Sequence, residues 1–311
     1  MLLFAALAVG LGTPGPLPYP ISPRPLRLLV QQSEFIVIAR VREAEPNRRE
    51  LALKEEGAFG DRVVVLDIES LVKGDPGVTA IEQVTYSAGC PSPPRYVDGK
   101  RVLAFLDRRP GARGFTTPAY SYGVKTLDDA GLALYLERIR EQLAILEMRD
   151  DELRLATQVE WLVTCAENAA TRWEGAFELA PDGDIMFRYV RAPVGDFARH
   201  LSNAQRERLR AAFLAAPTLG LGESCLEELF RDDEDPRLQA WLVDQLRAHC
   251  TEVEERSLGA AAILIQRIAR RDERPEVRKL AAGFAALWGY PPHAGDAQGR
   301  LEVCRELLAL F

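Results

Sequence analysis

The spacing of apolar residues changes once along this chain, and that change constrains the fold more than any other feature. Between residues 33 and 124 the apolar positions come in short runs that are continuous or alternate with polar ones, which is typical of β-strands. Turn residues such as Gly, Pro and Asp close each run. The five runs are "EFIVIARVREA", "DRVVVLDIESLVKG", "VTAIEQVTY", "KRVLAFLD" and "RGFTTPAYSYGV". Five strands with no helix between them predict a small barrel or a sandwich.

The segment that follows these runs has helical spacing instead. In "LDDAGLALYLERIREQLAIL" the apolar residues recur every three or four positions, at Leu132, Leu136, Ile139, Leu143 and Leu146. Asp128 and Asp129 precede them, where acidic residues cap and stabilise a helix N-terminus. We expect one helix that packs this apolar stripe against the barrel.

Beyond about residue 150 the apolar spacing is helical as far as residue 311. The expected helices are 153–169, 203–216, 222–231, 236–250, 256–271, 275–289 and 297–310. Two of them begin alike, with Pro236 and Pro275 in the first turn, where the missing N–H of proline costs nothing. Their offset of 39 residues is close to the period of two-helix solenoid repeats, and a plain helical bundle fits equally well. Residues 178–197 are expected to form a short hairpin or an ordered loop.

The first 25 residues are predicted to lie outside both regions. The run "MLLFAALAVGLG" is apolar and uncharged, and it suits the hydrophobic part of a secretory signal, although basic residues before it are missing. Six prolines follow between residues 14 and 25 and predict an extended tether. We therefore expect export, with a buried N-terminal segment as the alternative. No transmembrane helix is expected, because no stretch has about 18 consecutive apolar residues.

The charge of the chain argues against some classes of partner. The formal net charge is −7, and residues 151–311 hold most of the excess, with 27 acidic and 20 basic side chains. An acidic surface repels nucleic acid and anionic lipid. We therefore expect a protein partner, and no nucleic acid.

The cysteines and histidines do not predict a metal site. The five cysteines are Cys90, Cys165, Cys225, Cys250 and Cys304, and none forms a CxxC pair. Only three histidines are present, at positions 200, 249 and 293, so we expect no metal and no cofactor. In an exported protein the last four cysteines would most simply pair as Cys165 with Cys225 and Cys250 with Cys304; buried thiols are the equal alternative.

Catalytic signatures are missing from the sequence. It contains no GxSxG, HExxH, Walker loop or strand-linked GxGxxG motif. The acidic run from Asp232 to Asp235 lacks the alternate spacing and the glycine of a calcium loop, which favours a solvated helix connection. Trp173 is interpreted as packed between helices, with an exposed recognition residue as the alternative. Cys90 has no histidine within 100 positions to activate it as a nucleophile. We therefore expect no catalytic residues.

The order of motifs in the first half resembles the netrin-like module. These motifs are "FIVIARV", then "LDIESLVKG" at 66–74, then the Gly89-Cys90 pair ahead of "DGKRVLAFLD", then a last strand and a helix. This module is the OB-fold barrel of the tissue inhibitors of metalloproteinases and of secreted bacterial relatives, and the resemblance covers about residues 28–147. In the family, the cysteine that matches Cys90 commonly bonds to one near the last strand. Here Tyr120 and Tyr122 stand in that region, so Cys90 would be a remnant half-cystine or would pair with a cysteine of the helical half, and the resemblance implies a structural role for it.

Together these features predict an α+β protein of two domains. Residues 26–148 would form a five-stranded OB-like β-barrel with a capping helix, and residues 151–311 an all-α domain, HEAT-like or a bundle. The resemblance implies a secreted or envelope-located bacterial protein that binds another protein without catalysis, with protease modulation as the more specific function. The animal inhibitors chelate the protease zinc with an N-terminal cysteine, and this chain has no cysteine before Cys90.

The partner contact is expected at two places in the first domain. One is the tether before Leu26. The other is the loop from Gly89 to Tyr96, in which the candidate contact residues are Gly89, Cys90, Arg95 and Tyr96. Two functions of other classes remain as alternatives. One is a hydrolase or transferase with a site between the domains, and the other is a structural envelope protein that assembles with copies of itself.

Overall fold

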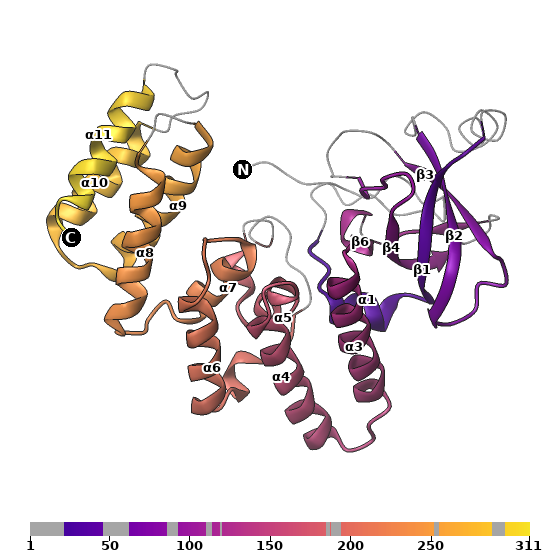
Figure 1. The fold of residues 1–311 in the computed structure, drawn as a ribbon. Helices are drawn as coiled ribbons and strands as arrows, with labels where there is room; N and C mark the ends of the chain where they lie inside the picture. Colours follow the sequence, from indigo (N-terminus) through magenta and orange to yellow (C-terminus); the bar gives the residue numbers. More distant parts are fainter. Residues whose placement is uncertain are drawn as a thin grey trace, which may run out of the picture. The chain divides into compact units, whose positions relative to one another are not determined.

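A computed structural model shows that the chain folds into two compact units (Figure 1). It describes residues 22–45, 62–85, 93–109, 114–118, 120–184, 187, 194–251, 255–287 and 296–311. One unit comprises Met1–Glu147 with Ile185–Pro193, and we call it the barrel unit. The other comprises Met148–Asp184 with Val194–Phe311, and we call it the helical unit. The predicted α+β class with two parts is confirmed.

The barrel unit contains one antiparallel sheet. Its strands are β1 (Phe35–Glu43), β2 (Arg62–Lys73), β3 (Ala80–Thr85), β4 (Arg101–Arg108), β5 (Phe115–Thr116) and β6 (Val124–Thr126). The strand order is β3-β2-β1-β4-β5, and β6 also pairs with β4. Four of the five expected strands are present, whereas the fifth is divided. A 3-10 turn at Tyr120–Gly123 separates β5 from β6, because the chain folds back so tightly that Gly123 leaves no room for a Cβ beside the carbonyl of Pro118.

Apolar side chains of alternate strand residues fill the interior of the sheet. They are Phe35, Val37, Ala39, Val41, Val64, Leu66, Ile81, Tyr96, Val102, Ala104, Leu106, Phe115 and Val124. On the opposite face of β1 and β4, Ile36, Leu103 and Phe105 are also fully buried, so these central strands are covered on both sides. Two helices, α1 (Leu26–Gln32) and α3 (Asp129–Leu146), pack against each other beside the sheet (Figure 1).

Side chains bridge the two edge strands, β3 and β5. Gln83 on β3 donates from Nε2 to the carbonyl oxygen of Phe115 on β5 at 3.2 Å. Thr117, which follows β5, donates from Oγ1 to Gln83 Oε1 at 3.2 Å. These bonds take the place of a backbone ladder between the edges, so the sheet forms a nearly closed barrel.

The end of α1 is held by the motif "LDIESLVKG". Lys73 donates from Nζ to the carbonyl oxygens of Val30 and Ser33, at 2.7 Å and 2.6 Å. The last carbonyls of a helix have no partner within it, and a cation also offsets the negative end of the helix dipole. Gly74 follows with φ +66°, and a Cβ there would lie 2.6 Å from the carbonyl oxygen of Glu34. Lysine and glycine of the motif therefore both have structural roles.

The helix α3 is present as predicted, although its buried face differs. Asp128 caps it by accepting a hydrogen bond from the Gly131 amide at 2.7 Å. The buried residues are Leu132, Tyr135, Arg138, Ile139, Gln142 and Ile145. Of the expected stripe, Leu146 is exposed. The stripe assigned from aliphatic residues alone left out Tyr135, Arg138 and Gln142, which lie on the buried face.

The helical unit contains eight α-helices among the described residues. They are α4 (Asp151–Glu167), α5 (Arg172–Leu179), α6 (Asn203–Leu214), α7 (Leu221–Leu229), α8 (Pro236–His249), α9 (Glu255–Arg271), α10 (Pro275–Ala286) and α11 (Asp296–Leu308). Both expected prolines stand at the start of a helix, in α8 and α10. No helix among the described residues has both the length and the apolar character to cross a membrane.

The helix α5 was not expected from the sequence. Its eight residues contain Gly175, which lowers helix propensity. That glycine allows a close approach to α4, because a Cβ at this position would overlap the carbonyl oxygen of Leu162. Tertiary packing therefore stabilises a helix that local propensity disfavours. In the predicted hairpin region, a short 3-10 turn forms at Pro181–Gly183, and most of residues 185–193 lie outside the described residues.

One of the two expected disulfides is present. Cys250 and Cys304 are joined, with their Cα atoms 6.1 Å apart. Cys165 and Cys225 are buried thiols and do not pair with each other, which corrects the first expected pairing. A Cβ at Gly175 would lie 2.9 Å from Cys165 Cβ, and one at Gly183 would lie 2.5 Å from Cys225 Cα. The two cysteines therefore pack into different contacts, one against α5 and one against the turn after it.

Candidate functional site

The loop that leads into β4 carries two of the four residues expected to contact a partner. We call residues 93–100 the Arg95 loop. It contains Arg95 and Tyr96, whereas Gly89 and Cys90 lie outside the described residues. Arg95 is exposed, but the side chain of Tyr96 belongs to the barrel core and the residue is 3% exposed. The Tyr96 ring is therefore not available to a partner.

Hydrogen bonds to the barrel fix the backbone of the Arg95 loop. The amide of Val41 donates to the carbonyl oxygen of Lys100, and the amide of Gly99 donates to that of Val41, both at 2.8 Å. Arg62 donates from Nη1 to the carbonyl oxygen of Tyr96 at 2.8 Å. Gly99 has φ +71°, a conformation that suits glycine. The loop is thus held as a rigid extension of the sheet.

The side chains of the same loop face solvent. Val97 is 50% exposed, and the exposed cations Arg95 and Lys100 flank it in the sequence. The carboxylate of Asp98 accepts a hydrogen bond from the Glu43 amide at 3.2 Å, which reduces its availability to a partner. Sequence reasoning missed Val97, although an apolar residue directly before an Asp-Gly turn was a signal for it.

A buried polar chain lies beneath the loop. The hydroxyl of Tyr96 is 3.3 Å from Thr117 Oγ1, which in turn donates to the Gln83 amide oxygen. Burial of the phenol raises the pKa of Tyr96 to about 12, because the phenolate form would lose its hydration. The same residues that close the barrel therefore also anchor the Arg95 loop.

The end of α1 lies at the other end of β1 from the Arg95 loop. Lys73, which holds that helix end, pairs with Ile36 at the beginning of β1. Arg101, directly after the Arg95 loop, pairs with Arg40 further along the same strand. Residues 1–21 of the expected tether lie outside the described residues.

The solvent face of β1, β2 and β4 carries paired charges. Arg40 and Arg101 donate to the Glu69 carboxylate at 2.9 Å and 2.7 Å. Arg42 donates to both oxygens of Asp67, at 2.9 Å and 3.1 Å. Hydrogen bonds from Arg101 and Arg42 lower the pKa values of Glu69 and Asp67, respectively. Arg42 is thus matched by Asp67, whereas Arg40 and Arg101 share Glu69, and Arg101 also pairs with Asp129 of α3 at 3.1 Å.

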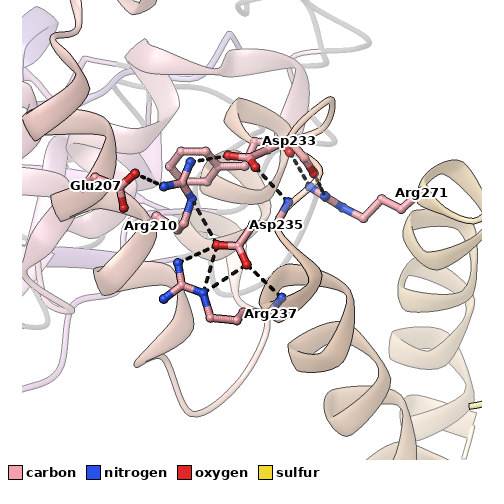
Figure 2. Close-up of polar contacts among 7 residues, drawn as sticks. Glu207, Arg210, Asp233, Asp235, Arg237 and Arg271 are labelled. Atoms are coloured by element: carbon pink, nitrogen blue, oxygen red, sulfur yellow. Dashed lines mark hydrogen bonds and ion pairs between the residues drawn. The ribbon is translucent and has the colours of Figure 1, made fainter.

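In the helical unit, arginines pair with the acidic run between α7 and α8 (Figure 2). Arg210 of α6 pairs with Asp233, and its Nε lies 3.6 Å from Asp235 Oδ2. Arg237 donates from Nη2 to the same Asp235 oxygen at 2.6 Å, and its hydrogen bonds lower the pKa of Asp235 to about 2. The sequence favoured a solvated connection, but Asp235 is largely covered and bound to arginine. Among the described residues, no cluster of His, Cys, Asp and Glu is arranged to hold a metal ion.

A buried group of charges joins α7 to α9. Arg267 and Arg271 of α9 both pair with Glu227 of α7, which is 1% exposed. Arg271 also donates to the carbonyl oxygens of Phe230 and Asp233, at 2.5 Å and 2.9 Å, near the end of α7 (Figure 2). The Phe230 carbonyl also accepts from the Asp233 amide at 3.0 Å, so Arg271 adds a second hydrogen bond to the turn that follows α7. The group therefore fixes the packing of two helices.

The remaining chemical groups of the helical unit also have structural environments. Burial raises the pKa of the Cys225 thiol, so little of it is the reactive thiolate at neutral pH. Trp173 donates from Nε1 to Asp184 Oδ2 at 2.8 Å, and its ring centroid is 5.2 Å from that of Phe177. Trp173 is half-buried, and these contacts are with its own helix and with the end of the turn that follows it, so its predicted packing between helices stays a prediction.

Comparisons with models of protein families, with curated proteins and with solved structures give no match for this chain. The description of the nearly closed barrel and of the helical unit therefore comes from the structure alone.

Proposed function

We propose that this protein is a non-catalytic, exported protein-binding protein and that the Arg95 loop contacts its partner. One observation supports this placement more than any other. Val97 is half-exposed on a loop whose backbone is bonded to the barrel at Val41 and Arg62. A lone exposed valine is ordinary on a protein surface. An exposed valine on a backbone that is hydrogen-bonded to the barrel is a better candidate for recognition.

Rigidity matters here because binding orders flexible groups at a cost. A loop that is already fixed loses little conformational entropy when a partner covers it. Function is also concentrated on loops that a rigid scaffold positions. The hydrogen bonds of Gly99 and Lys100 with Val41 give the Arg95 loop this property.

The side chains of the loop suggest the chemistry of the partner. Arg95 and Lys100 are exposed cations on either side of Val97. Such a surface complements a protein patch with an apolar centre and an acidic rim, the usual arrangement of a small interface. A protease is the partner class that the netrin-like resemblance implies. Because no cysteine precedes Cys90, we place the contact on the Arg95 loop and not on a zinc-chelating N-terminus.

Export is supported by two independent features. One is the apolar run of residues 1–12, which suits the hydrophobic part of a secretory signal. The other is the disulfide between Cys250 and Cys304, since stable disulfides occur mainly in oxidising compartments.

The test is a crosslinking experiment followed by binding measurements. A photoreactive amino acid at position 97 of the full chain would capture the partner in the envelope fraction of the source cells. Binding of the purified partner would then be measured for the wild type and for the Val97→Asp variant. We expect Val97→Asp to weaken binding at least about tenfold, because it places a charge in the apolar centre of the interface.

The matched control is Val78→Asp, which makes the same change at another exposed valine of the barrel unit, before β3. This variant should bind within about twofold of the wild type. Unchanged binding by Val97→Asp, or an equal loss in both variants, would overturn the placement of the contact. Turnover of a substrate by the purified chain would contradict the non-catalytic function.

A further inference from the structure

The disulfide of the helical unit joins the first and last of four consecutive helices. Cys250 stands at the C-terminal end of α8, and Cys304 lies in α11, 54 residues further along the chain. The helices α9 and α10 lie between them in the sequence. The crosslink therefore closes a loop that contains α9, α10 and the first part of α11.

The helices α10 and α11 are also tied to each other. Arg274, at the start of α10, donates from Nη1 to the carbonyl oxygen of Leu310 at 2.9 Å. Its guanidinium lies 4.5 Å from the centre of the Phe311 ring. These contacts fasten the residues after α11 to the beginning of α10. The two helices thus form a hairpin with its own internal links.

Among the described residues, few apolar side chains of this hairpin are buried. Val277 and Phe284 are the buried residues of α10, and the buried apolar residues of α11 are Leu301, Cys304 and Leu307. Segments with few buried apolar contacts are those that open locally before the rest of a protein unfolds. A crosslink can therefore contribute strongly to the docking of the α10–α11 pair.

We propose that the Cys250–Cys304 disulfide is a redox-controlled latch that holds the α10–α11 hairpin on α8 and α9. In an oxidising compartment the latch is closed. A dithiol opens it by supplying two electrons: one thiolate attacks the disulfide, the second thiol then closes the reagent into a cyclic disulfide, and Cys250 and Cys304 become thiols. The hairpin then separates from α8 and α9, and its helices of 12 and 13 residues lose their hydrogen bonds once undocked, because isolated helices of this length are marginal in water.

The other two cysteines of the helical unit do not compete with this latch. Cys165 and Cys225 are fully buried, so an external thiol cannot reach them in the folded unit. Thiol–disulfide exchange within the helical unit is therefore restricted to Cys250 and Cys304.

The test is hydrogen exchange with mass spectrometry on the folded, oxidised full chain, before and after treatment with dithiothreitol. We expect amides of α10 and α11 to exchange about a thousandfold faster after reduction, the scale of loop-closure entropy for a crosslink over this many residues. Amides of α4 to α7 should keep their rates. The Cys250→Ser/Cys304→Ser double variant should show the fast pattern without reductant, and Cys90→Ser should respond as the wild type does.

Two outcomes would overturn the proposal. Unchanged exchange in α10 and α11 after complete reduction would show that the disulfide does not control their docking. Equal acceleration in α4 to α7 would show that reduction unfolds the whole unit and opens no local latch. If the double variant does not fold, reduction of the folded wild type still tests the proposal, because it compares exchange in α10 and α11 with exchange in α4 to α7.

Discussion

Lys73 lies 40 residues beyond Ser33 in the sequence, yet its Nζ stands 2.6 Å from the Ser33 carbonyl oxygen. This bond ties the end of α1 to the end of β2. Burial lowers the pKa of Lys73, whereas the charge of Asp107 opposes this shift. Lys73 belongs to the motif "LDIESLVKG", on which the resemblance to the netrin-like module partly rests. Because the lysine and the following glycine position a helix, these motif residues inform on the fold and not on an activity.

Replacement of Gly74 should destabilise the barrel unit far more than replacement of Gly77. Both glycines have positive φ, +66° and +73°, so alanine is strained at either position. Only at Gly74 would the new Cβ also lie 2.6 Å from the carbonyl oxygen of Glu34, whereas Gly77 has open space. We expect Gly74→Ala to cost about 3 kcal/mol and Gly77→Ala about 1 kcal/mol. Hydrogen exchange of β1 amides during unfolding in urea would measure the loss of unfolding free energy in each variant. Equal losses would mean that Gly74 does not lie close to the carbonyl oxygen of Glu34.

Stability of the barrel unit should fall at alkaline pH because of Tyr96. Its pKa is about 12 in the folded protein and about 10 in the unfolded chain. The neutral phenol therefore stabilises the fold fully below pH 10, and this contribution is lost as pH rises from 10 through 12. The loss amounts to about 2 to 3 kcal/mol.

The Tyr96→Phe variant isolates this effect. Phenylalanine keeps the buried ring and loses only the 3.3 Å contact with Thr117 and the titration. The unfolding free energy of the variant, measured at pH 9 and pH 11.5, should change less between the two values than that of the wild type. An equal fall in both proteins would assign the alkaline transition to other groups.

Local patterns predicted most of the elements but not how they close on one another. Period-two runs located the central strands, and proline at the first turn located α8 and α10, because these signals depend on near neighbours. The closure of the barrel depends on Gln83 meeting Phe115 and Thr117, residues more than 30 positions away. No local spacing encodes such a contact.

The candidate site shows the same limit. The sequence pointed to the region before β4, but exposure alone separates Tyr96, which is buried, from Val97, which is not. Neighbouring residues in an irregular loop have no fixed alternation, so their orientation follows from the hydrogen bonds of Arg62 and Gly99 with the barrel. The helix α5 was missed for a related reason, since Gly175 is unfavourable locally and favourable only against α4.

Removal of the charge on Glu227 should strongly destabilise the helical unit. This carboxylate is the shared partner of Arg267 and Arg271, and all three side chains are almost fully buried. Glu227→Gln would remove the charge that Arg267 and Arg271 share, and the loss of one partner of a buried ion pair costs about 3 to 5 kcal/mol. Urea unfolding followed by tryptophan fluorescence would measure it, since every tryptophan of the chain lies beyond residue 150.

The control for Glu227→Gln is Glu302→Gln. Glu302 is exposed on α11 and accepts a hydrogen bond from Gln298 at 3.1 Å, which a glutamine could also accept. It should change the unfolding free energy by less than about 0.5 kcal/mol. A small effect of Glu227→Gln, comparable with that of the control, would mean that the buried arginines find other partners.

Protonation of Asp235 should make the helical unit less stable in acid. Hydrogen bonds from Arg237 lower the pKa of this carboxyl to about 2, compared with 3.8 in an unfolded chain. A carboxyl with a lowered folded pKa contributes stability that is fully present above pH 4 and is lost as pH falls from 4 through 2, because protons bind the unfolded chain more readily.

Asp235→Asn keeps an N-cap acceptor for the Arg237 amide and removes the charge, so it should flatten the dependence of the melting temperature on pH in this window. Asp244→Asn is the control, because Asp244 lies on the same helix with about two thirds of its side chain exposed. The idea fails if both variants keep the wild-type slope, since the ion pair of Asp235 with Arg237 would then contribute nothing to folding.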